Sequence, residues 1–179
     1  MSTEIPLNGP VLLLMRHATR DMSDDGLSET GLKQASLLPE RYKNLCASLG
    51  RPAPSGSLKI KSSPKARTRA TVRNLAAENS ASVEIETRLD ERISGEAVER
   101  FEKRVESFLE DALVWAEKQA RSETPETWVA CSHLDWLEHA SLVIPSDEND
   151  FERSEPWPPM TIRAYVFQNG IWNRAKVKS

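Results

Sequence analysis

Residue types that bind metals are scarce in this chain of 179 residues, which has two cysteines and three histidines. Cys46 and Cys131 lie far apart in the sequence, and no cysteine or histidine spacing suits a zinc site. The histidines, His17, His133 and His139, form no His-Glu-x-x-His pair. The sequence therefore predicts no metal site, and we expect no other cofactor.

A charge excess of one sign and a long apolar run are also missing. The formal net charge is −3, and basic and acidic residues are mixed along the chain. Nucleic-acid binding usually needs a clustered basic surface, so we expect no nucleic-acid partner. No apolar run approaches the length of a membrane-spanning helix, and we expect no membrane partner. Residues 1–10 lack the basic start and the apolar core of a secretory signal, which favours a cytoplasmic location.

The composition predicts a folded domain of ordinary size. Hydrophobic residues make up 39% of the chain and charged residues 28%, which is typical of globular proteins. A chain of this length can bury a substantial core. We therefore predict one domain over residues 1–179, while the sequence leaves the oligomeric state open.

Two residues with reactive side chains are assigned to packing. Cys46 and Arg51 have one residue fewer between them than the cysteine phosphatases have, and Cys46 lies late in a helical pattern. We interpret Cys46 as a core thiol. His139 also lies in a helical pattern, and we interpret it as a surface or packing histidine.

Hydrophobic periodicity alternates between strands and helices along the chain. Strands are predicted at 11–15, 58–61, 83–86 and 127–131, followed by a hairpin of 162–167 and 171–176. Helices are predicted at 28–49, 63–77, about 101–116 and 134–142. Ser63 is expected to cap the second of these helices, with Pro64 at its first position.

This order of elements predicts an α/β fold, a three-layer α/β/α sandwich with a mostly parallel central sheet. The carboxyl ends of parallel strands open on one edge of a sheet, where such folds bind ligands. Strands that end near Met15, Lys61 and Cys131 would therefore bring four side chains into one pocket, namely Arg16, His17, Arg67 and His133.

These four side chains have the chemistry that phosphoryl transfer needs. At the end of its strand, the His17 imidazole can attack a phosphorus while the Arg16 guanidinium holds the phosphoryl oxygens. Arg67 falls in the first turn of a predicted helix, whose free N–H groups and partial positive charge add to its own charge. The other cations of this helix are expected to be exposed charges, namely Lys65, Arg69 and Arg73.

Two further segments carry several fixed positions each. Leu27–Ala35 reads Leu-Ser-x-x-Gly-x-x-Gln-Ala, and Ser62–Thr71 reads Ser-Ser-Pro-x-x-Arg-Thr-x-x-Thr. Val129–His133 is a strand that ends in Ser-His, and Leu89–Glu96 contains a Leu-x-Glu motif. Together with the Arg-His pair, these segments resemble the histidine phosphatase superfamily over residues 11 to about 142.

The resemblance implies a phosphoglycerate mutase-like fold, in its small single-domain branch, and a metal-independent phosphatase. It implies that His17 forms a phosphohistidine that water hydrolyses, while Arg16, Arg67 and His133 hold the phosphoryl oxygens. His133 is thus both a catalytic and a phosphate-binding residue by this likeness.

The resemblance also assigns the general acid to the Leu-x-Glu segment, which maps it to Glu91. Asp90, its neighbour, and Glu86, at a strand end, remain alternatives. Thr19 and Arg20 follow the first motif and are possible substrate contacts.

Three positions depart from the family pattern. Ala18 and Leu134 stand where the family commonly has glycine after each histidine. Ser23 stands where an asparagine is expected, and Thr19 is the polar residue that often follows the first of these glycines. The departures concern substrate contacts and turnover, and we expect activity to survive them.

Three functions fit the sequence. The first is hydrolysis of a phosphomonoester, with a phosphorylated small molecule or a phosphoprotein as the substrate. The second is a phosphohistidine protein phosphatase of the short-chain type, which the small size and the lack of a cap insertion favour. A mutase is weaker. The third is a phosphate-binding module that lost turnover through the Ala18 and Leu134 changes.

Overall fold

The computed structural model describes residues 9–51 and 58–176. Its strands are β1 (Val11–Arg16), β2 (Leu58–Ser62), β3 (Val83–Ile85), β4 (Thr127–Ser132), β5 (Ile162–Gln168) and β6 (Ile171–Arg174). Its helices are α1 (Glu29–Ser36), α2 (Leu38–Ser48), α3 (Ala66–Glu78), α4 (Val98–Gln119), α5 (Leu134–Val143) and α6 (Asp150–Arg153), with a 3-10 turn η1 (Thr87–Leu89).

The strands form one six-stranded sheet in the order β3-β2-β4-β1-β5-β6. β1 and β2 both pair parallel with β4, and β3 pairs parallel with β2. β5 and β6 complete the sheet as an antiparallel hairpin beside β1. The predicted mostly parallel sheet is confirmed.

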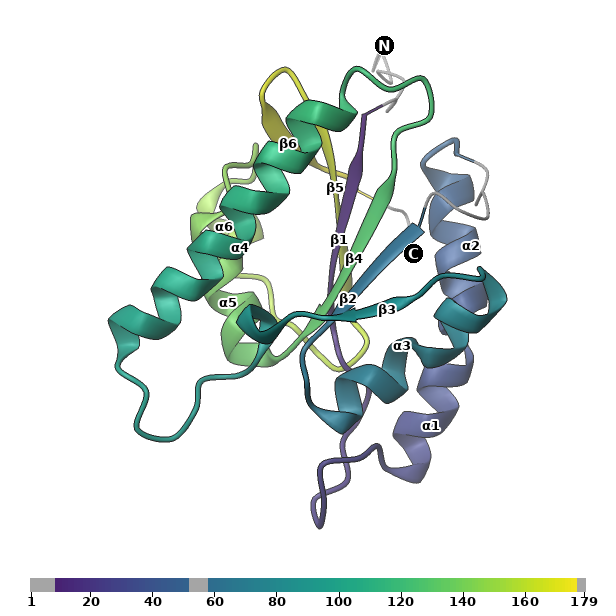
Figure 1. Ribbon diagram of the computed structural model, residues 1–179, viewed down its shortest axis with the longest axis vertical. Helices are drawn as coiled ribbons and strands as arrows, with labels where there is room; N and C mark the ends of the chain where they lie inside the picture. The colour runs from purple at the N-terminus through teal and green to yellow at the C-terminus, as the bar shows by residue number, and fades with distance from the viewer. Residues whose placement is uncertain (1–8, 52–57, 177–179) are drawn as a thin grey trace.

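Helices cover both faces of this sheet. Figure 1 shows α1, α2 and α3 on one side and α4, α5 and α6 on the other, which makes the predicted three-layer sandwich. The apolar run of β1 serves both faces because successive side chains alternate. Val11, Leu13 and Met15 pack on the side of α1–α3, while Leu12 and Leu14 pack on the side of α4 and α5.

The helix predicted over 28–49 is two helices, α1 and α2. Ser28 caps α1 as its side chain accepts a hydrogen bond from the Gly31 N–H. Leu37 ends α1 and begins α2, with Pro39 in the first turn of α2. Proline lacks an N–H and its ring clashes with the carbonyl four residues earlier, so Pro39 interrupts a continuous helix.

The start of α3 also differs from the prediction. Lys65 is the residue before the helix, and Ser63 lies two positions too early to cap it. The Ser63 hydroxyl instead accepts a hydrogen bond from the Lys65 N–H at 3.3 Å. Ser63 thus shapes the turn between β2 and α3, where it stays free to contact other side chains.

Several other boundaries shift by a few residues, and α6 was not predicted. α4 runs from Val98 to Gln119, and β6 ends at Arg174. The predicted hairpin turn is confirmed, with Asn169 and Gly170 both at positive φ. That backbone matches the right-handed twist of the two strands.

The two packing assignments are confirmed. Cys46 is 6% exposed, and burial raises the pKa of its thiol. His139 is half-buried beside the Phe101 ring, with Glu102 and Glu106 each within 4 Å of its nitrogens. In the described part of the chain, no helix is long and apolar enough to cross a membrane. The cytoplasmic location stays a prediction.

Candidate active site

The carboxyl ends of three parallel strands meet at one edge of the sheet. Arg16 at the end of β1 pairs in register with Ser132 of β4, and Ser62 of β2 pairs with Cys131. The segments that follow these three strands line the same cavity of about 530 Å³. Its lining comprises Arg16, His17, Thr19, Arg20, Met22, Arg67, Glu91, His133, Leu134, Asp135, Glu138 and Pro159.

His17 lies at the centre of this cavity as a neutral imidazole. Its Nδ1 is 2.6 Å from the Ala18 carbonyl, which can only accept, so Nδ1 carries the proton and donates it. Burial lowers the pKa of His17 to about 4, helped by the nearby Arg67 and Arg16 charges. Nε2 therefore holds a lone pair, which faces the Nε of Arg67 at 3.3 Å.

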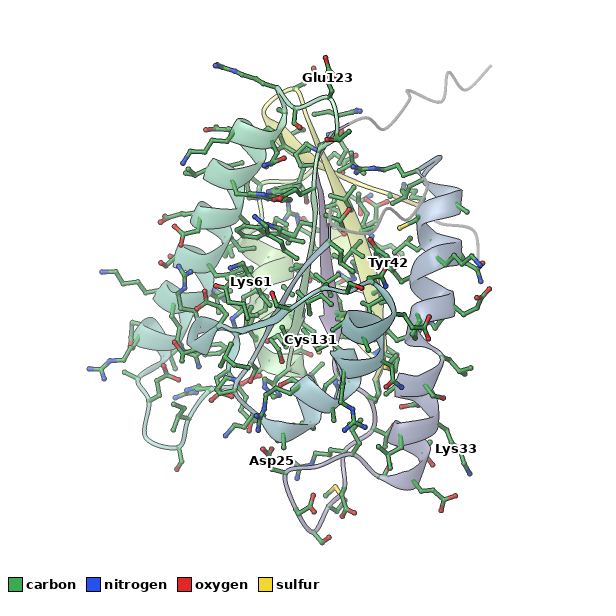
Figure 2. All side chains as sticks on the ribbon, turned by 45° about the vertical axis from the view of Figure 1, so that its right-hand side comes forward. Asp25, Lys33, Tyr42, Lys61, Glu123 and Cys131 are labelled. Atoms are coloured by element: carbon green, nitrogen blue, oxygen red, sulfur yellow. The ribbon has the colours of Figure 1, made fainter. Side chains whose placement is uncertain are left out.

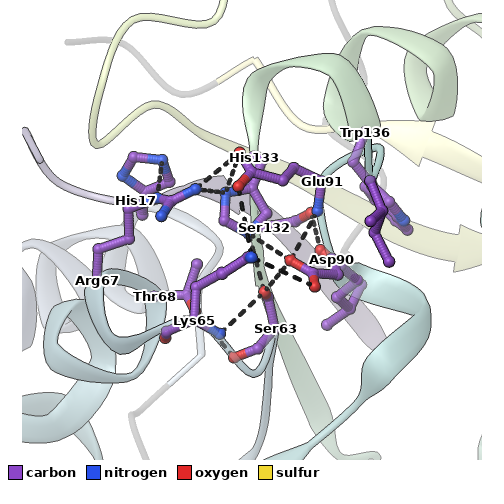
Figure 3. A network of polar contacts seen from close by, with 12 residues as sticks. His17, Ser63, Lys65, Arg67, Thr68, Asp90, Glu91, Ser132, His133 and Trp136 are labelled. Carbon is purple, nitrogen blue, oxygen red and sulfur yellow. Dashed lines mark hydrogen bonds and ion pairs between the residues drawn. The ribbon is translucent and has the colours of Figure 1, made fainter. Parts of the chain in front are cut away.

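Arg67 joins the cavity's reactive groups (Figure 3). Its side chain is 4% exposed, and its Nη2 is 2.7 Å from the Glu91 carboxylate and 3.2 Å from Nδ1 of His133. Its Nη1 forms an ion pair with Asp25. Because the guanidinium is planar and its donors point in fixed directions, these contacts fix its orientation toward His17.

His133 packs edge to face against His17, with ring centroids 5.2 Å apart. Burial and the Arg67 charge lower the pKa of His133 to about 2, so its imidazole is neutral as well. Its Nε2 is 2.8 Å from the Ser63 hydroxyl. The predicted meeting of Arg16, His17, Arg67 and His133 is therefore what the structure shows.

Asp25 is a charged contact that the sequence analysis did not single out. One of its carboxylate oxygens pairs with Arg67, and the other accepts the N–H of Ala66 at 2.6 Å. Ala66 is the first residue of α3, so the carboxylate occupies the positive end of that helix. Figure 2 shows Asp25 at the end of the molecule from which α3 starts. No local pattern marks this contact, because it joins a loop to a helix far along the chain.

The three carboxylates considered as general acid lie in different places. Glu91 lines the cavity and reaches Arg67, and its other oxygen is 3.7 Å from Lys65 Nζ. Asp90 is 9% exposed, does not line the cavity, and accepts from the Ser63 hydroxyl and the Glu91 N–H. Glu86 is bound on both oxygens by Arg88. Of the three, only Glu91 faces the cavity.

Arg16, at the end of β1, lines the cavity and is held in place by the segment before β5. Its Nη1 donates to the Trp157 carbonyl at 2.6 Å, and its Nε is buried without a partner among the described residues. Burial lowers the pKa of Arg16, while Glu138 and Asp135 raise it. These two carboxylates lie on the same rim of the cavity, so the rim is acidic beside a cationic centre.

Thr19 and Arg20, the predicted substrate contacts, both line the cavity. Gln34 of α1 holds the Thr19 backbone and hydroxyl through its side-chain oxygen, at 2.9 and 3.0 Å. A Cβ on Gly31 would lie 2.0 Å from the Thr19 carbonyl, so only glycine lets α1 approach this loop. The Gly and Gln of the Leu27–Ala35 motif thus position the residues that follow His17.

The three departures from the family pattern are accommodated in different ways. Ala18 is fully buried, donates its N–H to the Thr71 hydroxyl at 3.0 Å, and is not among the described residues with positive φ. Leu134 begins α5 and adds an apolar side chain to the cavity lining. Ser23 binds Asp21 within its own loop and does not line the cavity.

One expectation about the helix cations is wrong. Arg69 and Arg73 are exposed as expected. Lys65 is half-buried, with its Nζ 3.9 Å from Asp90 and 3.7 Å from Glu91. The reason is that the η1–α4 connection folds over the start of α3, which local sequence does not reveal. Within residues 9–51 and 58–176, no group of His, Cys, Asp and Glu is placed to hold a metal ion.

Comparison with solved structures finds the same fold. "Mycobacterial hydrolase 1" is 15% identical, with a TM-score of 0.70, 92% of this chain covered and 96% of that one. The mycobacterial glucosyl-3-phosphoglycerate phosphatase in complex with VO3 is 16% identical (TM-score 0.66, 94% and 98% covered). A phosphoserine phosphatase from Entamoeba histolytica is also 16% identical (TM-score 0.64, 93% and 95% covered). A comparison with curated proteins gives no match.

The fold thus defines the class, an α/β protein of the phosphoglycerate mutase-like type. The model of the histidine phosphatase superfamily (branch 1) matches residues 12–146, and the chain belongs to this family. Membership indicates a phosphatase or mutase-type enzyme. The resemblance found in the sequence motifs is confirmed.

Proposed function

We propose that this protein is a phosphatase that hydrolyses a phosphomonoester, of a small molecule or a protein, through a phosphohistidine on His17. The observation that carries the proposal is the state of His17. Its Nδ1–H is held by the Ala18 carbonyl, and its Nε2 lone pair accepts the Nε–H of Arg67, a residue that lines the cavity with His17. A neutral imidazole fixed in this way is ready to act as a nucleophile.

In the proposed reaction, Nε2 of His17 attacks phosphorus, and the ester P–O bond breaks. Arg16 and Arg67 balance the charge on the phosphoryl oxygens, and the unpaired Arg16 Nε supplies a donor for one of them. Water then attacks the phosphohistidine and releases inorganic phosphate. The P–N bond breaks in this step, which returns the lone pair to Nε2.

Glu91 is the proposed proton donor to the leaving oxygen. A phosphoryl group on Arg67 would compete with Glu91 for Nη2, since both are anions that need the same donor. Once released from Arg67, the Glu91 carboxyl can deliver the proton that the leaving oxygen needs. In the second step the Glu91 carboxylate accepts a proton from the attacking water.

A phosphohistidine protein phosphatase is the second candidate. The connection between η1 and α4, residues 90–97, contains no helix or strand that could form a cap over the cavity. A cavity without such a cap gives a side chain of another protein access to His17. The neighbours whose names state a substrate act on phosphorylated small molecules, which favours the first candidate.

The decisive test is to trap the intermediate. Purified protein is mixed with a panel of phosphorylated metabolites and phosphohistidine peptides, denatured rapidly without acid, and analysed by mass spectrometry. We expect an acid-labile, base-stable phosphate on His17, lost together with turnover in His17→Ala and kept in the control His139→Ala. Phosphate found on His133 would overturn the assignment. Phosphate binding without turnover of any substrate would identify a binding module.

A further inference from the structure

His133 is connected away from the cavity to a buried carboxylate. Its Nε2 is 2.8 Å from the Ser63 hydroxyl, and that hydroxyl donates to Oδ1 of Asp90 at 3.2 Å. His133 is 2% exposed, Ser63 is fully buried, and Asp90 is 9% exposed. Figure 3 shows this series of contacts running from the cavity toward the segment after η1.

The hydrogen-bond partners assign every proton in this series. The Lys65 N–H can only donate to the Ser63 oxygen, and the Asp90 carboxylate can only accept from it. The remaining lone pair of Ser63 must therefore accept the Nε2–H of His133. On the other side, Arg67 Nη2 can only donate to His133 Nδ1, at 3.2 Å. His133 thus carries its proton on Nε2, and Nδ1 faces the cavity as a lone pair.

A lone pair on Nδ1 suits the empty cavity but not one that holds a phosphoryl group. Phosphoryl oxygens are acceptors, so His133 can bind one only after Nδ1 gains a proton. The imidazolium that results is a buried cation, which is costly without an opposite charge nearby. Asp90 supplies that charge, through Ser63 and with its Oδ1 3.5 Å from Nε2.

We propose that Ser63 and Asp90 are positioning residues that fix the tautomer of His133 and stabilise its imidazolium, so that binding of a dianionic phosphoryl group is coupled to proton uptake at Nδ1. The inference rests on the proposed function, because it takes the cavity to bind that group. The proton comes from solvent and forms an N–H bond that donates to a phosphoryl oxygen.

Titratable groups around His133 act on this step in both directions. The groups that face it from the start of α3, the end of β1, α4 and the segment after η1 are Lys65, Arg67, His17, Arg104, Asp90 and Glu91. Arg67, His17, Lys65 and Arg104 all lower the pKa of His133. Glu91 lies 3.8 Å from Nδ1 of His133. However, it is bound to Nη2 of Arg67, the donor for which a phosphoryl group would compete. Asp90 is therefore the carboxylate that remains with His133 in the complex.

Asp90 lies outside the cavity lining, so its proposed role differs from that of an acid that contacts the substrate. Its Oδ1 accepts from the Ser63 hydroxyl and from the Glu91 N–H at 2.9 Å, and it does not line the cavity. Replacing Asp90 with asparagine keeps an oxygen acceptor for both bonds, removes the charge and puts an amide nitrogen in place of Oδ2, which is 3.9 Å from Lys65 Nζ. Asp90→Asn therefore tests the charge while both hydrogen bonds of Oδ1 are kept.

The test measures sulfate affinity by calorimetry from mildly acidic to mildly alkaline pH. Sulfate stays a dianion throughout, so its affinity reports only protonation of the protein. We expect affinity in the unmodified protein to fall as pH rises and to level off above the pKa of His133 in the complex, with proton uptake on binding below that pKa. In Asp90→Asn the affinity should level off at lower pH, because the pKa of His133 in the complex is lower, and it should be reduced about tenfold at neutral pH. Glu84→Gln, which removes an exposed charge on β3, should keep the original profile.

Two further measurements separate the outcomes. Nitrogen NMR of the imidazoles should show a charged His133 in the sulfate complex of the unmodified protein and a neutral one in Asp90→Asn at the same pH. His133→Gln should flatten the pH profile. Sulfate binding with identical profiles for Asp90→Asn and Glu84→Gln would overturn the inference alone. Failure of the unmodified protein to bind sulfate or phosphate at His17 and Arg67 would overturn the proposed function as well.

Discussion

Arg67 donates its Nε–H to Nε2 of His17 at 3.3 Å, across fifty positions of sequence. The nitrogen proposed to attack phosphorus therefore accepts a hydrogen bond from a cation. This contact keeps the His17 ring neutral and fixes its orientation. The contact needs the fork of the guanidinium, because the same side chain also meets Asp25, Glu91 and His133 in other directions.

This geometry predicts that Arg67→Lys damages catalysis. A lysine ammonium is a point charge, so it cannot donate hydrogen bonds to His17, His133 and a phosphoryl oxygen at the fixed angles of a guanidinium. We expect kcat/KM to fall roughly a hundredfold or more, with little change in the melting temperature. The matched control is Arg69→Lys, an exposed cation of the same helix, which should leave kinetics unchanged. Full activity in Arg67→Lys would contradict this prediction and show that Arg67 contributes only its charge.

The two buried histidines predict that acid destabilises the fold. The folded pKa of His17 is about 4 and that of His133 about 2, both below the ordinary 6.5 of an unfolded histidine. The unfolded chain therefore binds more protons as pH falls below 6.5, and the stabilisation present above that pH is lost progressively toward the folded values. Between about pH 7 and pH 5 we expect a loss on the order of 1–2 kcal/mol for each histidine.

Urea unfolding at a series of pH values measures this effect. His17→Gln and His133→Gln should each flatten the slope of stability against pH in this range, although both variants start from a lower stability. His139→Gln serves as the control, because His139 is half-buried and its ring lies near two carboxylates. A slope that survives in both active-site variants would mean that other groups cause the acid sensitivity.

The Gly31 contact predicts that one methyl group disrupts the loop after His17. In Gly31→Ala the new Cβ would lie 2.0 Å from the Thr19 carbonyl, so α1 or the loop must move. We expect a loss of about 1–3 kcal/mol in unfolding free energy and lower activity, since Thr19 and Arg20 line the cavity. Thr30→Ala, at an exposed neighbouring position, should change neither. Unchanged stability in Gly31→Ala would show that the loop yields freely.

The sequence predicts the layers and the meeting of strand ends because both follow from local periodicity. β1 begins with an unbroken apolar run, and β1, β2 and β4 each end at a motif residue. The helical apolar period continues across Pro39, so the period alone does not reveal that this proline separates α1 from α2. The ion pair of Asp25 with Arg67, and the placement of Lys65 beside Asp90, depend on how loops fold over α3. Local pattern carries no signal for such contacts.

Glu91 as proton donor gives the last prediction, because an acid matters in proportion to how badly the leaving oxygen needs a proton. Glu91→Gln should slow hydrolysis of alkyl phosphates strongly and of an activated aryl phosphate much less. Steady-state kcat/KM for both substrate types measures this. Glu86→Gln is the control among the alternatives, since Glu86 is held by Arg88 away from the cavity.

The pattern of losses decides what Glu91 does. Equal slowing of both substrate types would make Glu91 a binding residue, because the deficit would no longer follow the leaving group. A selective loss in Glu86→Gln instead would move the acid to a carboxylate that the cavity does not contain, and would contradict the geometry as well. A phosphohistidine peptide gives an independent arm, because its nitrogen leaves readily and needs little help from a carboxyl. Near-normal hydrolysis of that peptide by Glu91→Gln, beside poor alkyl phosphate hydrolysis, is the result that the proposed donor requires.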